Sequence, residues 1–92
     1  VDFFLHSAQN LHGEMESGLA AEDFPATRRA AHSLKSSSRM FSAENLATLC
    51  AETERLAGQQ QADAIALLLP RIRSELNWLT NELPTFCAEM LS

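Results

Sequence analysis

A histidine in the first half of the chain stands among cations in an otherwise acidic protein. The 92 residues carry a net charge of −5, yet the twenty residues between Asp23 and Glu44 contain no acid. They hold His32 and four of the seven basic residues of the chain, which are Arg28, Arg29, Lys35 and Arg39. A neutral imidazole is a competent nucleophile, and cations and hydroxyl groups hold phosphoryl oxygens without a deep pocket. These residue types favour a site that accepts a phosphoryl group and passes it on.

The same chain lacks the features that would let it take this group from ATP. It has no glycine-rich phosphate loop and no nucleotide-binding pattern, and its acids form no metal-binding cluster. His6 and His12 are six residues apart, which fits neither helical spacing of metal ligands, so we expect no metal site. We therefore expect a phosphocarrier rather than an enzyme, with no cofactor in this chain and with its donor and acceptor on other proteins.

Composition narrows the class of protein further. Hydrophobic residues make up 46% of the chain and charged residues 21%, which is typical of one globular domain, here residues 1–92. The negative net charge argues against a nucleic-acid partner. The longest apolar run, residues 64–69, is far shorter than the ~20 residues that span a bilayer, so we expect no direct membrane insertion. The two cysteines, Cys50 and Cys87, make no disulfide framework and favour a reduced, cytoplasmic protein.

The elements that must position the histidine are helices, because apolar residues recur at every third or fourth position along the chain. Ser42 is a predicted N-cap, and Gly58 is expected to end the helix that follows it. Pro70 predicts a kink or a short break, and Pro84 predicts the end of the last helix or a second bend. The predicted helices span residues 2–21, about 24 to near 42, 44–58, and a long segment after the polar turn 59–61.

Four amphipathic helices joined by short connections predict an all-α fold, an antiparallel up-and-down four-helix bundle. In the second helix the predicted core side is formed by Ala30, Ala31, Leu34, Ser38 and Phe41, with Met40 also expected to fill the core. His32 lies about 200° around the helix from Leu34, so it faces solvent. At helical spacing from it, one exposed stripe carries Arg28, Arg29, Lys35, Ser36 and Arg39.

Two short stretches resemble the signature of histidine-containing phosphotransfer (HPt) domains. The segment AAHSLKSSS, residues 30–38, is similar to the family's H-x-L-K-G around its phosphorylated histidine. The segment SAENLATLCAETE, residues 42–54, resembles the L-x-x-L-C-x-x-x-E stretch that follows it. The likeness is close over the second and third helices, whereas the first and the fourth match only in length and apolar spacing.

The resemblance implies roles for His32 and Lys35 and partner docking for the helix surface around them, although Arg28, Arg29 and Arg39 could also be ordinary solvated charges. His32 would accept a phosphoryl group from a receiver-domain aspartate and pass it to the aspartate of a response-regulator receiver domain, with Lys35 beside the phosphoryl group. The surface with Arg28, Arg29, Ser36 and Arg39 would bind the phosphoryl group or the partner. Mg²⁺ would sit on the receiver domain, and a histidine kinase, separate or in the same chain, is a further expected partner.

Two other functions stay open from the residues alone. The chain could be a helical module that binds a receiver or kinase domain through the same face without being phosphorylated. It could also be an acid–base hydrolase, which is the weaker alternative because no carboxylate lies within reach of His32 on its own helix.

The sequence departs from the family pattern at two positions, because Ser36 and Ser42 stand where glycine is common. Ser36 would either donate a hydrogen bond to the phosphoryl group or crowd it. Cys50 matches a buried cysteine of the family. We expect a cytoplasmic monomer, and the valine at position 1 favours the C-terminal domain of a membrane-bound hybrid sensor kinase over a freestanding protein.

Overall fold

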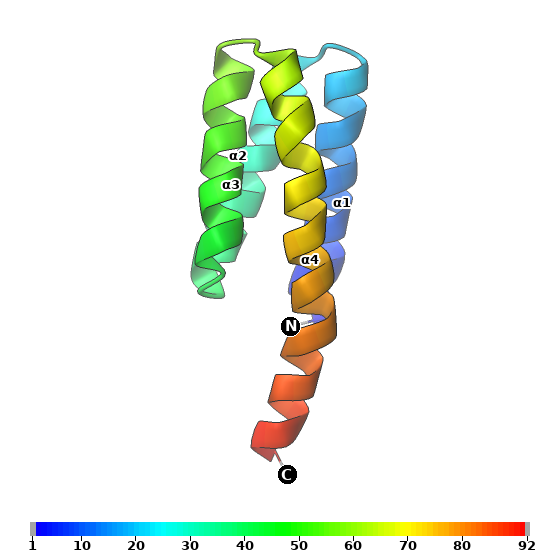
Figure 1. The fold of residues 1–92 in the computed structure, drawn as a ribbon, viewed down its shortest axis with the longest axis vertical. Helices are drawn as coiled ribbons and strands as arrows, with labels where there is room; N and C mark the ends of the chain where they lie inside the picture. The colour runs from blue at the N-terminus through cyan, green and yellow to red at the C-terminus, as the bar shows by residue number, and fades with distance from the viewer. Residues whose placement is uncertain (1, 92) are drawn as a thin grey trace.

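The protein folds into four consecutive helices. A computed structural model describes the backbone of residues 2–91 and the side chains of residues 3–79. Figure 1 shows the helices running alternately up and down, with α4 packed against α1 and extending past the end of the other three. The predicted antiparallel bundle is confirmed, and the bounds of the first three helices agree with the sequence analysis to within about two residues. The helices are α1 (Asp2–Ala20), α2 (Phe24–Met40), α3 (Glu44–Gly58) and α4 (Ala62–Leu91).

The core lies along the bundle axis where the apolar stripes of the four helices meet. Leu34 of α2 is fully buried, and the largest fully buried apolar side chains around it are Met15, Leu46, Ile65 and Ile72. Every predicted inward position of α4 from Ile65 to Leu79 is buried, while Leu83 lies outside the described side chains. The 3.6-residue periodicity therefore identified the buried face of each helix.

Two predicted core residues at the end of α2 are instead exposed. Met40 is 82% exposed and Phe41 45% exposed, so the core assignment was wrong for both. The reason is that α2 ends at Met40, about two residues before the predicted end near residue 42, so Met40 is its last residue and Phe41 lies in the connection to α3. There its ring stacks on that of Phe4, with 4.5 Å between the ring centroids.

A glycine sets the contact between α1 and the start of α2. A Cβ atom built at Gly18 would lie only 2.5 Å from Oγ1 of Thr27, so no larger residue fits without movement of one helix. The buried Thr27 hydroxyl donates a hydrogen bond to the carbonyl of Met15 at 3.4 Å. This close approach holds one face of α2 against α1 and leaves its opposite face, with Arg28 and His32, in solvent.

The three connections, residues 21–23, 41–43 and 59–61, share one backbone geometry. The middle residue of each has a left-handed φ of 57°. In the second connection the N–H of Ala43 donates to the carbonyl of Ser38 at 2.8 Å, which closes the end of α2 as a Schellman motif does. The left-handed residues are Glu22, Ser42 and Gln60. Ser42 is thus the closing residue of α2, and its predicted role as N-cap was wrong, because Ala43 holds that position without a side-chain cap.

Replacing Ser42 by glycine should stabilise the protein. The left-handed conformation strains a residue with a Cβ atom and leaves glycine unstrained, so Ser42→Gly should raise the free energy of unfolding by about 1 kcal/mol in urea denaturation. Ser74→Gly is the matched control in an exposed turn of α4, where glycine should instead cost roughly 0.5 kcal/mol. A lower stability of Ser42→Gly would show that Ser42 makes a stabilising contact that outweighs the strain.

The two prolines of α4 do not interrupt it. The helix is continuous through Pro70 and past Pro84 to Leu91, so the predicted short break and the predicted end were wrong. Pro70 removes only the hydrogen bond to the carbonyl of Ala66, and both residues are exposed, so water can bond the freed carbonyl. The long fourth helix therefore keeps its apolar face on the core across Pro70.

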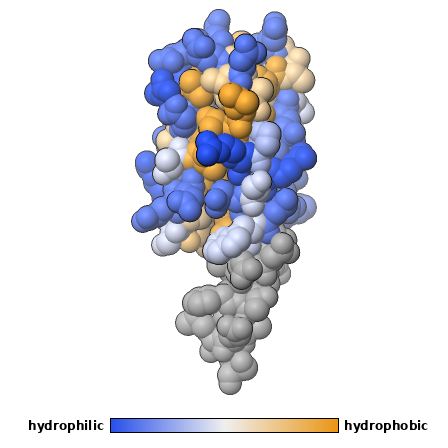
Figure 2. All heavy atoms as spheres, viewed as in Figure 1, coloured by the Kyte–Doolittle hydropathy of each residue, from blue (hydrophilic) through white to orange (hydrophobic). Residues whose placement is uncertain are grey.

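The outer surface is polar with scattered apolar side chains. Figure 2 shows an apolar strip between polar flanks on the face formed by α3 and α4. Leu67 and Trp78 are largely exposed, the latter in keeping with a place at the bundle edge. Among the described residues no helix is both long enough and apolar enough to cross a membrane.

Candidate functional site

His32 projects from the middle of α2 into solvent, as predicted, and a carboxylate on another helix holds it. The imidazole side chain is 60% exposed, and its Nδ1 lies 2.7 Å from Oε2 of Glu54. Glu54 belongs to α3, which packs side by side with α2 along its length. The packing of α2 on α3 thus gives His32 a partner from outside its own helix.

Lys35 binds the other oxygen of the same carboxylate. Its Nζ donates a hydrogen bond to Oε1 of Glu54 at 2.6 Å, and the two side chains are mostly buried, with 17% and 19% exposed. Lys35 is one helical turn after His32, so both residues project toward the same point on α3. Glu54 therefore joins the two predicted site residues into one cluster, which we call the His–Glu–Lys cluster (His32, Glu54 and Lys35).

The electrostatics of this cluster select one tautomer of the neutral imidazole. The hydrogen bond from Lys35 lowers the pKa of Glu54 below its ordinary 4.5; the bond from His32 and both positive charges add to this, against the opposing effect of burial. Glu54 is therefore a carboxylate at neutral pH and can only accept hydrogen bonds. A neutral His32 must then carry its proton on Nδ1, which leaves the lone pair on Nε2. The cluster presents a nucleophilic nitrogen to solvent.

Sequence reasoning included Glu54 as the last residue of the L-x-x-L-C-x-x-x-E stretch but gave it no role in the site, although a second signal for it was present. Glu54 comes four residues after Cys50, which is fully buried, so the helical spacing places its carboxylate on the inward side of α3. A carboxylate on that side needs a partner within the bundle. The spacing alone could not show that this partner is His32, because the relative rotation of two helices is set by their packing.

The arginines before the histidine gather beside a cavity between α2 and α3. The cavity has a volume of about 690 Å³ and opens next to His32. Its lining includes Arg28 and Arg29, which project from the exposed side of α2, together with Glu54. Of the other predicted site residues, Ser36 and Arg39 are exposed on α2 but do not line this cavity. Of the five predicted stripe residues, the structure therefore brings Arg28 and Arg29 to the cavity that His32 lines, and it joins Lys35 to His32 through Glu54.

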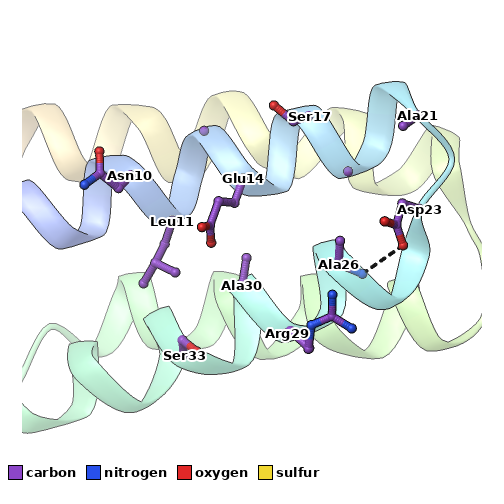
Figure 3. Close-up of a pocket in the computed structure, with 12 residues that line it drawn as sticks. Asn10, Leu11, Glu14, Ser17, Ala21, Asp23, Ala26, Arg29, Ala30 and Ser33 are labelled. Carbon is purple, nitrogen blue, oxygen red and sulfur yellow. Dashed lines mark hydrogen bonds between the residues drawn. The ribbon is translucent and has the colours of Figure 1, made fainter.

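A second cavity lies on the other side of α2, between α2 and α1, with a volume of about 850 Å³ (Figure 3). Leu11 and Glu14 project into it from α1, toward Ala30 of α2. Arg29 lines both cavities, whereas His32 lines only the one against α3. The exposed side of α2 therefore borders two cavities. His32 lines the smaller one, which lies between α2 and α3.

The remaining histidines and the described cysteine are not members of the His–Glu–Lys cluster. His12 is buried, with Nε2 2.8 Å from the carbonyl of Leu69 and Nδ1 3.2 Å from Glu16, whereas His6 is exposed. Burial raises the pKa of Cys50 to about 12, so its thiol stays protonated and unreactive at neutral pH. Cys87 is outside the described side chains. Within residues 3–79, no three or more His, Cys, Asp or Glu side chains are arranged to hold a metal ion.

An antiparallel four-helix bundle with an exposed, carboxylate-held histidine on its second helix fits a helical phosphocarrier. Comparison with known families agrees, because residues 1–89 match the Hpt domain. The chain belongs to the Hpt domain family, whose members are phosphocarriers and not kinases, and this membership supports a phosphotransfer role in two-component signalling. Phosphorelay partners such as receiver domains and kinases follow from this membership. No curated protein and no solved structure matches the chain.

Proposed function

We propose that the domain is a phosphorelay intermediate in which His32 accepts a phosphoryl group from a receiver-domain aspartate and passes it to the aspartate of a response-regulator receiver. The observation that supports this proposal is the His–Glu–Lys cluster. It combines an exposed imidazole with an ionised carboxylate 2.7 Å from Nδ1, so Nε2 is the free nucleophile. Helical geometry alone would expose a histidine, but it would not select its tautomer.

Acceptance of the phosphoryl group exchanges one bond for another. The Nε2 lone pair of His32 attacks phosphorus, the bond from phosphorus to the aspartyl oxygen breaks, and its electron pair stays on the aspartate carboxylate. Because Nδ1 keeps its proton, the phosphorylated ring is cationic, and the Glu54 carboxylate stabilises that charge. Transfer onward reverses these bonds, with the carboxylate oxygen of the acceptor attacking phosphorus and the electron pair returning to Nε2.

The neighbouring side chains complete the proposed site. Lys35 supplies positive charge beside the phosphoryl oxygens while it holds Glu54, and the hydroxyl of Ser36 lies one turn after His32 on the exposed side of α2. Arg28, Arg29 and Arg39 add positive charge to the exposed surface of α2. In this proposal the receiver domain holds the Mg²⁺ that neutralises the charge of the transferring phosphoryl group.

The experiment that tests this function is a transfer assay with purified components. The domain is incubated with phosphorylated receiver domains and Mg²⁺ and analysed by intact-mass measurement and phosphorus NMR. One added phosphoryl group that is labile in acid and stable in base is the expected product, as for a phosphohistidine. Absence of transfer from every receiver, with the domain folded, would favour the module that binds receivers or kinases without being phosphorylated.

Glu54→Gln should slow transfer roughly tenfold, because the neutral amide no longer selects the Nδ1–H tautomer or stabilises the charged ring. Nitrogen NMR of the His32 ring should show the proton shared between Nδ1 and Nε2 in the variant. The matched control is Glu52→Gln on the same helix, whose carboxylate pairs with Arg55, away from His32. An unchanged tautomer together with an unchanged rate would contradict the role of Glu54.

The same variant should also change how stability depends on pH. The pKa of Glu54 is lower in the folded protein than its ordinary 4.5, so its ionised form stabilises the fold. This contribution is present above pH 4.5 and is lost as the pH falls through the lowered pKa. The stability difference between wild type and Glu54→Gln should therefore shrink in acid, as measured by urea denaturation across that range.

A further inference from the structure

His12 is a buried titratable side chain that the proposed transfer does not use. Its side chain is 7% exposed and belongs to α1, which packs beside α4 (Figure 1). Nε2 of the ring is 2.8 Å from the carbonyl oxygen of Leu69 in α4, and Nδ1 is 3.2 Å from Oε1 of Glu16, one turn further along α1. Both ring nitrogens of this buried histidine therefore face an oxygen atom.

The two oxygen atoms determine what the ring has to donate. A carbonyl oxygen only accepts hydrogen bonds, so Nε2 of His12 carries a proton. An ionised carboxylate also only accepts, so a neutral ring would turn the lone pair of Nδ1 toward the negative charge of Glu16. A ring with a proton on both nitrogens makes both hydrogen bonds and pairs its charge with Glu16. The geometry therefore fits the imidazolium form better than the neutral ring.

The charged neighbours of His12 come from α1 and α4. Glu16 also accepts hydrogen bonds from Nη2 of Arg73 in α4, at 3.0 Å and 3.2 Å to its two oxygens. Arg73 is 61% exposed, so water screens its repulsion of a charged His12, while Glu16 contacts both cations. The cavities that His12 lines, of about 510 and 240 Å³, are formed by α1 and α4. Among the described residues, no charged side chain of α2 lines them.

We propose that His12 holds a second proton while α1 and α4 are packed together and releases it when they separate, which makes this helix contact sensitive to pH. The unfolded chain offers the ring water in place of Glu16 and the Leu69 carbonyl, so the folded domain binds this proton more tightly. The resulting stability is fully present in acid, below the pH of about 6.5 at which a free histidine loses its proton. It is lost as the pH rises to the point at which the folded domain releases the proton.

This device acts in the opposite direction to Glu54, whose contribution to stability is lost in acid. It is also independent of the proposed function, because the His–Glu–Lys cluster uses side chains of α2 and α3 only. Its test is therefore a measurement on the protein without a receiver domain, and failure of phosphotransfer would leave it unaffected.

Nitrogen NMR of the His12 ring measures its protonation directly. At pH 7, where an exposed histidine is mostly neutral, both ring nitrogens of His12 should show the resonances of protonated nitrogen. In Glu16→Gln one of them should become unprotonated at the same pH, because the amide has no charge to pair with the ring. An unprotonated ring nitrogen of His12 in the wild type at pH 7 would overturn the proposal.

Urea denaturation at several pH values measures the effect on stability. The folding equilibrium constant of the wild type, divided by that of Glu16→Gln, should be about tenfold larger at pH 6 than at pH 8. His6 and His32 are present in both proteins, so their contributions cancel in this ratio. The matched control is Glu14→Gln, which removes an exposed carboxylate of α1 that lines the cavity against α2 and should behave like the wild type. A ratio that does not change with pH, or an equal change in Glu14→Gln, would contradict the proposal.

Discussion

His32→Gln should abolish phosphoryl acceptance and leave the fold intact. The variant, incubated with phosphorylated receiver and Mg²⁺, should show no added phosphoryl mass under conditions that load the wild type, because it lacks the Nε2 lone pair. Its melting temperature should stay within a few degrees of wild type, since the side chain is 60% exposed and its removal leaves no cavity. Circular dichroism should show unchanged helicity.

A second histidine variant serves as the control. It tests whether phosphorylation requires His32 in particular or is lost on removal of any exposed histidine. His6→Gln removes an exposed histidine from α1 and should be phosphorylated like the wild type. Retained phosphorylation of His32→Gln would place the acceptor on another residue, and a large drop in its melting temperature would show that His32 supports the core.

Leu34→Ala should destabilise the protein more than any exposed change in α2. Leu34 is fully buried two residues after His32, and its truncation leaves a cavity that costs about 2–5 kcal/mol. A domain of this size has a free energy of unfolding of roughly 5–14 kcal/mol, so the loss should be a large part of the total. Urea denaturation monitored by circular dichroism measures it directly.

Leu67→Ala is the control, because it makes the same chemical change at an exposed position of α4. It should cost less than about 0.5 kcal/mol. A cost near zero for Leu34→Ala would mean that α2 turns a different face to the core, and the exposure of His32 would then have to be reassigned as well.

The sequence was sufficient to predict the bundle and the exposed histidine. Helical periodicity depends on local spacing, so Leu34 and Ala31 fixed the inward face of α2 and thereby the outward direction of His32. The predicted start of the second helix at about residue 24 is also correct: α2 begins at Phe24, and the Asp23 carboxylate before it accepts a hydrogen bond from the N–H of Ala26 at 3.2 Å. Features that depend on one helix were therefore predictable.

Features that depend on the packing of two helices could not be predicted from the sequence. Glu54 reaches His32 and Lys35 only because α3 packs on α2 with a particular rotation, which no spacing within α3 encodes. The Ser42 error has a similar origin, since a serine before an acidic first turn is also the pattern of an N-cap. In the structure Ser42 instead has a left-handed backbone conformation within the connection between α2 and α3. The cavity beside His32 likewise exists only between α2 and α3.

The bond between His32 and Glu54 makes reactivity depend on a tertiary contact. If α3 opened locally from α2, His32 would still be displayed, but it would exchange its proton freely between both ring nitrogens and would have no carboxylate to balance a charged ring. Competence for phosphotransfer would then follow the fraction of molecules in which the α2–α3 hairpin is closed. Amide hydrogen exchange in α3 and the rate of phosphorylation should therefore change together in variants that loosen this hairpin.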